Sequence, residues 1–140
     1  MILIGKNLIE NISKLKYEVP DVNVIDFYKD TKIKFNLVTV EERPSNNGIM
    51  TNNKQRLVSN NYTIEIYTKQ SKINDILSTN RDVALSIAKT IDDYLSNVLG
   101  MRMEGSVSSA PYFDNTVCRL IMRYVANIDI KENLIYKNYK

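Results

Sequence analysis

Apolar residues in the first part of the chain recur with the 3.6-residue period of an amphipathic helix. With successive residues placed about 100° apart, Ile4, Leu8 and Ile12 fall in one narrow stripe. The polar residues between them face the other way, and Pro20 follows where a helix has to stop. This pattern predicts a helix from about residue 3 to residue 17.

A second helical pattern lies between residues 83 and 99, and its apolar arc is wider, at about 160°. Thr79 and Asp82 have the spacing of a capping box at the start of this helix. Gly100 stands where a helix needs a left-handed residue to end. We therefore predict a long helix that lies flat on a sheet.

Apolar and polar residues alternate elsewhere with the period of a half-buried strand. Five strands are predicted in this way, at residues 22–25, 33–40, 61–68, 101–107 and 116–129. In the second of them the apolar positions change parity near Leu37. This change indicates either a β-bulge at Leu37 or a strand that is covered on both faces.

The segment from Glu41 to Asn61 has little periodicity and many turn-forming residues, among them Pro44 and Gly48. A compact domain seldom keeps so long a connection without a use for it. Two interpretations stay open for this segment. It is either a disordered surface loop or an arm that orders against a neighbouring subunit.

The order of these elements predicts one α+β domain over residues 1–140. We expect a largely antiparallel, mixed sheet of four to five strands, with two helices packed on one face. A flexible loop or hairpin arm is expected at about 42–60. The basic, tyrosine-bearing tail at about 131–140 is expected to be loose.

Composition removes several classes of function. The chain has 19 basic and 16 acidic residues, a balance too even to indicate a nucleic-acid binder by charge alone. It has no histidine and one cysteine, so neither an intramolecular disulfide nor a structural zinc site is expected. No secretory signal or membrane-spanning run is recognisable, and we expect folding in a cytoplasm.

The sequence offers little catalytic chemistry. Without histidine no Ser-His-Asp or Cys-His arrangement can form, and no glycine-rich phosphate loop is present. Asp92 and Asp93 are neighbours on the second helix, so they point apart and are expected to lie on a solvated face. Cys118 is expected to be a small core residue. We expect no catalytic, metal or cofactor site.

Arg119 and Arg123 lie four residues apart on the last predicted strand, so both point to the same face, about 13 Å apart. Ile121 stands between them. One interpretation is a solvated outer face with ordinary salt bridges. The other is a basic contact surface for an acidic partner or for passing nucleic acid.

The second half of the chain resembles the tail terminator and tail-completion proteins of phages, including the collar subunits of contractile tail-like particles. The residues that carry this resemblance are 62–67, 84–92, 99–103, 112–115 and 119–129, followed by Asn133 and Tyr136. They form a pattern of sheet, helix and punctuating residues over a little more than half of the chain. The first half agrees in the order of its elements only.

The resemblance implies a structural subunit without enzymatic activity. Six copies would form a ring on the head-proximal end of the tail tube, stop its growth, and join a neck, collar or sheath protein. The particle would assemble in a bacterial cytoplasm, with DNA only as passing cargo where a head is present. A closed ring of this kind needs two different patches on each subunit.

Within this hypothesis we expect the arm to contact a neighbour or the tube through Arg43, Asn52, Asn53 and Arg56. Arg119 and Arg123 are expected to face the lumen or an adjoining ring. The alternatives are a head-completion or neck connector near the portal, a small nucleic-acid-binding module, and a metal-dependent enzyme built on scattered aspartates. The first alternative belongs to the same structural class, and the other two predict salt-dependent DNA binding and a divalent-ion requirement.

Overall fold

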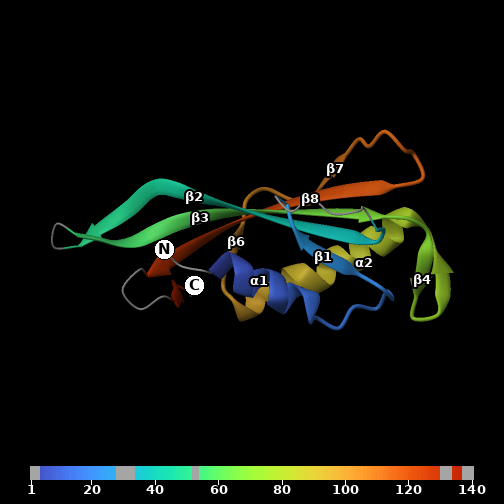
Figure 1. The fold of residues 1–140 in the computed structure, drawn as a ribbon, viewed down its shortest axis with the longest axis horizontal. Helices are drawn as coiled ribbons and strands as arrows, with labels where there is room; N and C mark the ends of the chain where they lie inside the picture. Colours follow the sequence, from blue (N-terminus) through green and yellow to red (C-terminus); the bar gives the residue numbers. More distant parts are fainter. Residues whose placement is uncertain (1–3, 28–33, 52–53, 130–133, 137–140) are drawn as a thin grey trace.

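A long, twisted sheet is the scaffold of the computed structural model, which describes residues 4–27, 34–51, 54–129 and 134–136 (Figure 1). Within these residues the sheet has seven strands. Its main path runs β1 (Asn23–Asp26), β2 (Leu37–Thr51), β3 (Lys54–Thr68), β8 (Cys118–Asp129) and β6 (Arg102–Met103). Two short strands, β7 (Ser108–Ala110) and β9 (Leu134–Tyr136), also pair with β8. Among the strand pairs that the described residues form in this sheet, only β1–β2 is parallel.

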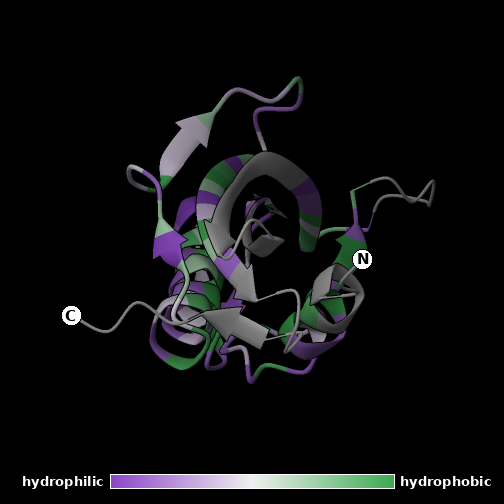
Figure 2. Cartoon of the chain, turned by 90° about the vertical axis from the view of Figure 1, so that its left-hand side faces the viewer, coloured by the Kyte–Doolittle hydropathy of each residue, from purple (hydrophilic) through white to green (hydrophobic). Residues whose placement is uncertain are grey.

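Both helices pack against the same face of this sheet, as predicted. They are α1 (Ile4–Ser13) and α2 (Asn80–Asp92), and α2 continues as a π-helix, η1, over Asp93–Val98. Figure 2 looks along the long axis and shows both helices on one side of the sheet, while β7 lies on the other side. The α+β prediction is therefore confirmed. The sheet has more strands than the four to five expected, because the short strands β7 and β9 also pair with β8.

The core forms where every second residue of three neighbouring strands meets the helices. Register places Val38, Ile66 and Leu120 in one cross-strand row, and the next inward-facing row is Val40, Ile64 and Met122. All six side chains are buried. Each large aliphatic side chain buried in this way contributes about 1.5–3 kcal/mol. Hydrophobic burial in these rows therefore fixes which face of the sheet receives the helices.

The start and the end of α2 follow the sequence signals. Thr79 is the N-cap, and its hydroxyl accepts a hydrogen bond of 3.2 Å from the Asp82 backbone N–H. Gly100 follows the π-helical turn with φ 70°, a left-handed conformation that glycine adopts without a steric cost. Both predictions are confirmed.

The first helix is shorter than predicted, because it ends at Ser13 and not near Tyr17. The Ser13 hydroxyl donates to the Glu10 carbonyl, and the Tyr17 hydroxyl donates to the Ile12 carbonyl at 2.7 Å. These side chains take up carbonyls of the last turn that have no partner within a helix. Leu15 and Tyr17 still pack against the core from the irregular segment that follows.

Of the two forms expected at about 42–60, a loop or a hairpin arm, the described part has the hairpin, because β2 and β3 continue through it as an antiparallel pair. Its turn-forming residues mark irregularities in the strands, where the register shifts between Pro44 and Gly48 and again between Ile49 and Met50. The change of parity near Leu37 is not a bulge. Leu37, Val38, Thr39 and Val40 are all buried, so the strand is covered on both faces there.

Besides β7, two short elements were not predicted. A two-stranded hairpin, β4 (Ser71–Ile73) and β5 (Ile76–Ser78), precedes α2. In the tail that we expected to be loose, β9 pairs with the end of β8, with Ile135 opposite Ile128. The tail prediction is therefore wrong for Leu134–Tyr136, and the rest of the tail lies outside the described residues.

Candidate assembly surfaces

The β2–β3 hairpin extends well beyond the helices, and we call its outer part, residues 43–58, the arm (Figure 1). Each strand has 15 residues, which corresponds to about 50 Å at the rise of an extended chain. The 13 residues of α2 and the six of η1 together span only about 29 Å. The helical layer is therefore too short to cover the sheet along its whole length.

The root of the arm is fixed to the rest of the sheet. β3 stays paired with β8 as far as Leu57 opposite Asp129, and the Ser59 hydroxyl donates to the Asn127 side chain at 2.9 Å. On the other side, the pairing of β1 with β2 ends at Val40. Pro44 lies beyond this point, where no described strand pairs with that side of β2, and a missing backbone N–H is tolerated on such an edge.

Four residues were expected to make contacts from the arm, and the structure describes only some of them. Arg43 lies on β2 at the root of the arm, where its exposed side chain forms an ion pair with the buried carboxylate of Glu41. Arg56 lies on β3, with its side chain outside the described residues. Asn52 and Asn53 also lie outside them. A contact role for these four residues stays a prediction.

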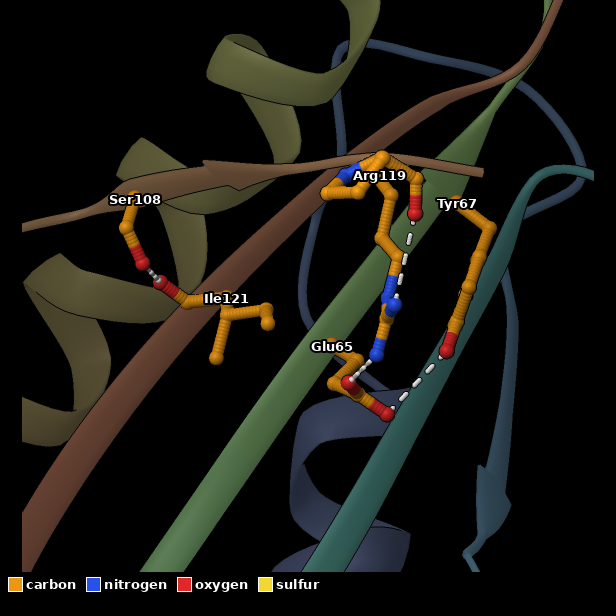
Figure 3. A network of polar contacts seen from close by, with 6 residues as sticks. Glu65, Tyr67, Ser108, Arg119 and Ile121 are labelled. Carbon is orange, nitrogen blue, oxygen red and sulfur yellow. Dashed lines mark hydrogen bonds and ion pairs between the residues drawn. The ribbon is translucent and has the colours of Figure 1, made fainter. Parts of the chain in front are cut away.

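A buried ion pair lies on the face of the sheet opposite the helices (Figure 3). The Arg119 guanidinium donates to the Glu65 carboxylate at 2.5 Å, and the Tyr67 hydroxyl donates to the other carboxylate oxygen at 3.1 Å. Only 9% of the Glu65 side chain and 28% of the Arg119 side chain are exposed. Hydrogen bonding to Glu65 raises the pKa of Arg119, while burial and then Glu65 raise the pKa of Tyr67 to about 12.

Arg119 is therefore engaged within its own chain, as the salt-bridge interpretation predicts. Its guanidinium also lies 5.6 Å from the centre of the Tyr67 ring, and it donates to the Pro111 carbonyl at 3.4 Å. Arg123 is exposed on the same face. Of the two cations expected on a contact surface, only Arg123 presents its side chain largely to solvent.

The loop between β7 and β8 carries an aromatic cluster that the sequence did not reveal. The Tyr112 ring contacts three other rings, at centroid distances of 4.4 Å to Phe113, 5.5 Å to Tyr67 and 6.3 Å to Phe35. Phe113 is 92% exposed. Its neighbour Asp114 accepts hydrogen bonds from the Thr116 hydroxyl and backbone N–H, which lower the pKa of this carboxyl. Tyr112 and Phe113 lie between the strands predicted at 101–107 and 116–129, where no periodic pattern could indicate the ring contacts.

The β4–β5 hairpin carries a second exposed apolar feature. Its turn residues Asn74 and Asp75 both have positive φ, at 48° and 66°, as a tight two-residue hairpin requires. The Asn74 backbone N–H donates to the Glu18 carbonyl at 3.0 Å and so ties the turn to the domain. Ile76 and Leu77 are 70% and 65% exposed.

No group of three or more acidic or cysteine side chains in the described part of the chain could hold a metal ion. Asp92 is half-buried and accepts hydrogen bonds from the Tyr124 hydroxyl at 2.7 Å and the Ser96 hydroxyl at 2.8 Å, so our expectation of a solvated Asp92 is wrong. Burial raises the pKa of the Cys118 thiol, and this residue packs against the core.

Comparison with known proteins adds no identification. No helix in the described part of the chain is both long and apolar enough to cross a membrane. No model of a known protein family matches this sequence, and no similar sequence is found among curated proteins. The arm and the exposed apolar side chains are therefore the features of the molecule that bear on its function.

Proposed function

We propose that this protein is a structural ring subunit that caps the head-proximal end of a phage tail tube or of a phage-tail-like particle. The observation that carries the proposal is the arm, a hairpin that continues beyond the helical layer of its own domain (Figure 1). An isolated two-stranded hairpin is only marginally stable in water. A hairpin that extends this far from its own domain is therefore suited to a contact with another subunit, which would stabilise it. The resemblance in the second half of the chain supplies the kind of assembly.

A closed ring is built from heterologous contacts, in which one surface of a subunit binds a different surface of the next. The chain offers such an asymmetry. The arm lies at one end of its long axis, while the β4–β5 hairpin and the β7–β8 loop lie at the other end (Figure 1). Exposed apolar side chains at Ile76, Leu77 and Phe113 give the second end the character of a protein contact.

The proposed partners are other copies of the chain, six in a ring, and the tail tube protein, with a sheath or neck protein on the outer side. Assembly would take place in a bacterial cytoplasm, and DNA would only pass through the ring. A head-completion or neck connector would use the same surfaces. The pairing of Arg119 with Glu65 counts against the nucleic-acid module, because it neutralises one of the cations on which that hypothesis depends, the others being Arg123 and the lysines of the tail.

A capping assay tests this function. Tail tube protein from the particle that contains this chain is polymerised alone and with the purified protein, and tube lengths are measured by negative-stain electron microscopy. We expect shorter tubes with added density at one end. Tubes of unchanged length without added density would contradict the proposal.

A variant with a shortened arm is the matched control. In it, residues 49–57 are replaced by Asn-Gly, which joins Gly48 to its partner Val58 by a two-residue turn. The core rows and the Ser59–Asn127 hydrogen bond stay in place. We expect a folded, cooperative domain that no longer caps tubes, and normal capping by this variant would show that the arm is not the contact.

A further inference from the structure

We propose that Arg119 is a lock that holds the β7–β8 loop, residues 111–117, in one conformation and so keeps the Phe113 ring in water. This inference goes beyond the ring function and does not depend on it, because it concerns contacts within one chain. Arg119 pairs with Ala110 at the base of the loop, so its side chain starts next to the segment that it holds. In this role Arg119 is a positioning residue.

The Arg119 guanidinium joins two segments that are distant in the sequence. It donates to the Glu65 carboxylate on β3 at 2.5 Å, and it also donates to the Pro111 carbonyl at the start of the loop at 3.4 Å (Figure 3). The donors of a guanidinium form one planar, rigid fork. The buried Glu65 carboxylate therefore fixes the position of the fork, and the fork fixes the first residue of the loop.

The Tyr112 ring holds the next residue of the loop. Its centroid lies 5.5 Å from that of Tyr67 and 6.3 Å from that of Phe35, both in edge-to-face geometry. Tyr67 is itself held, because its hydroxyl donates to Glu65 and the Arg119 guanidinium lies 5.6 Å from its ring centre. Arg119 therefore supports Tyr112 through Tyr67, in addition to its own bond to the loop.

The far side of the loop is held by other residues. The Asp114 carboxylate accepts hydrogen bonds from the Thr116 hydroxyl and backbone N–H at 2.7 and 2.9 Å, and the Val117 N–H donates to the Asp114 carbonyl. At the start of α2, the Asn80 side chain donates to the Thr116 carbonyl at 3.0 Å. With this side fixed, the contacts of Arg119 on the near side decide whether the loop can move.

Phe113 lies between these two sets of contacts and is 92% exposed. Its ring stacks on Tyr112 with a centroid distance of 4.4 Å and an interplanar angle of 30°. A large aromatic side chain gains free energy when it leaves water, so a loop that moved freely would turn this ring onto the sheet. The lock explains why the ring stays exposed.

Limited proteolysis of the full chain with chymotrypsin tests the lock, because this protease cleaves after tyrosine and phenylalanine. Cleavage at Tyr112 and Phe113 requires the loop to open, and its rate follows the population of the open form when opening is fast. We expect the wild type to be cut there at least about tenfold more slowly than a synthetic peptide of residues 108–120. Equal rates would show a free loop and overturn the proposal.

Arg119→Met removes the fork and keeps a side chain of similar length. We expect cleavage at Tyr112 and Phe113 to become at least about tenfold faster than in the wild type. Arg123→Met is the matched control, because Arg123 is exposed on the same strand and the same face. It should be cut like the wild type. Equal acceleration by this control would mean that any loss of positive charge loosens the loop, which contradicts the proposal.

Two further variants separate the lock from the stability of the whole domain. Val40→Ala truncates a core residue on the helix-covered face and leaves the contacts of Arg119 in place. If it is cut at Tyr112 and Phe113 as fast as Arg119→Met, the loop opens only with the whole domain and the proposal fails. Arg119→Lys keeps a charge beside Glu65 without the fork, so we expect it to loosen the loop as well. Wild-type resistance of this variant would overturn the proposal, even where Arg119→Met does not fold.

Discussion

Replacement of Arg119 by methionine tests whether the Arg119–Glu65 ion pair stabilises the fold as a buried pair does or only as much as a surface pair. The carboxylate of Glu65 is almost fully buried, and Arg119 is its charged partner at 2.5 Å. Breaking a fully buried pair costs about 3–5 kcal/mol, because a charge is left without compensation, whereas an exposed pair contributes about 0–1 kcal/mol. Since Arg119 is partly exposed and the Tyr67 hydroxyl still donates to Glu65, we expect a loss of roughly 2–3 kcal/mol in the free energy of unfolding.

Urea unfolding followed by circular dichroism measures this loss, and a double-mutant cycle with Glu65→Gln separates the pair from its surroundings. Glu65→Gln removes the buried charge and leaves Arg119 partly in water, so it should cost only about 1 kcal/mol. The double variant should be more stable than Arg119→Met alone. If the free energy of unfolding of Arg119→Met lies within about 0.5 kcal/mol of the wild-type value, the pair behaves as a surface pair, and the argument from the burial of Glu65 is refuted.

Three further predictions concern the core and the second helix. Burial raises the pKa of Tyr17, Tyr62 and Tyr124, so stability should be fully present below about pH 10, the unfolded pKa, and fall as the pH rises further. Phenolate absorbance should then show some tyrosines that ionise only on unfolding, and normal titration of all of them would contradict this. Gly100→Ala should cost about 1 kcal/mol in urea unfolding, because φ is 70° there, and an unchanged midpoint would refute the strain. Tyr124→Phe should cost about 1–3 kcal/mol, because the half-buried Asp92 carboxylate loses a donor, with Tyr94→Phe as the control without this bond.

Local patterns predicted those elements whose burial is periodic. The second helix could be placed from Thr79 to Gly100, because its cap, its apolar arc and its stop signal all agree. The alternation along β8 correctly divided its inward residues, such as Leu120 and Met122, from its outward ones. In each case one face of the element packs against the core, so apolar residues recur in the sequence with the period of that element.

Long-range pairing decided the elements that the sequence could not reveal. The arm is polar and contains Pro44 and Gly48, so its own residues favour a loop, but β8 and the register of β3 extend it as a hairpin. The aromatic cluster of the β7–β8 loop depends on contacts between segments that are distant in sequence, as when Tyr112 meets Tyr67. Likewise, the burial of Glu65 needs Arg119, which lies 54 residues away.

For the candidate contact residues as well, local sequence patterns predicted their position, whereas their partners became visible only in the structure. The sequence identified the arm as unusual and Arg43 as one of its cations, while the structure added the ion pair with Glu41. For Arg119 and Arg123, strand periodicity correctly predicted a shared face. It could not show that only Arg119 has a buried carboxylate partner. Ile76 and Leu77 escaped notice because a three-residue strand is too short to produce a periodic signal.

Native mass spectrometry of the full chain, alone and with tail tube protein, tests the ring most directly. Both samples are measured over a range of protein concentrations. Our account predicts a closed species with a single subunit number, six from the resemblance, that is lost when residues 49–57 are replaced by Asn-Gly. A protein that remains a monomer in both samples at every concentration would contradict it.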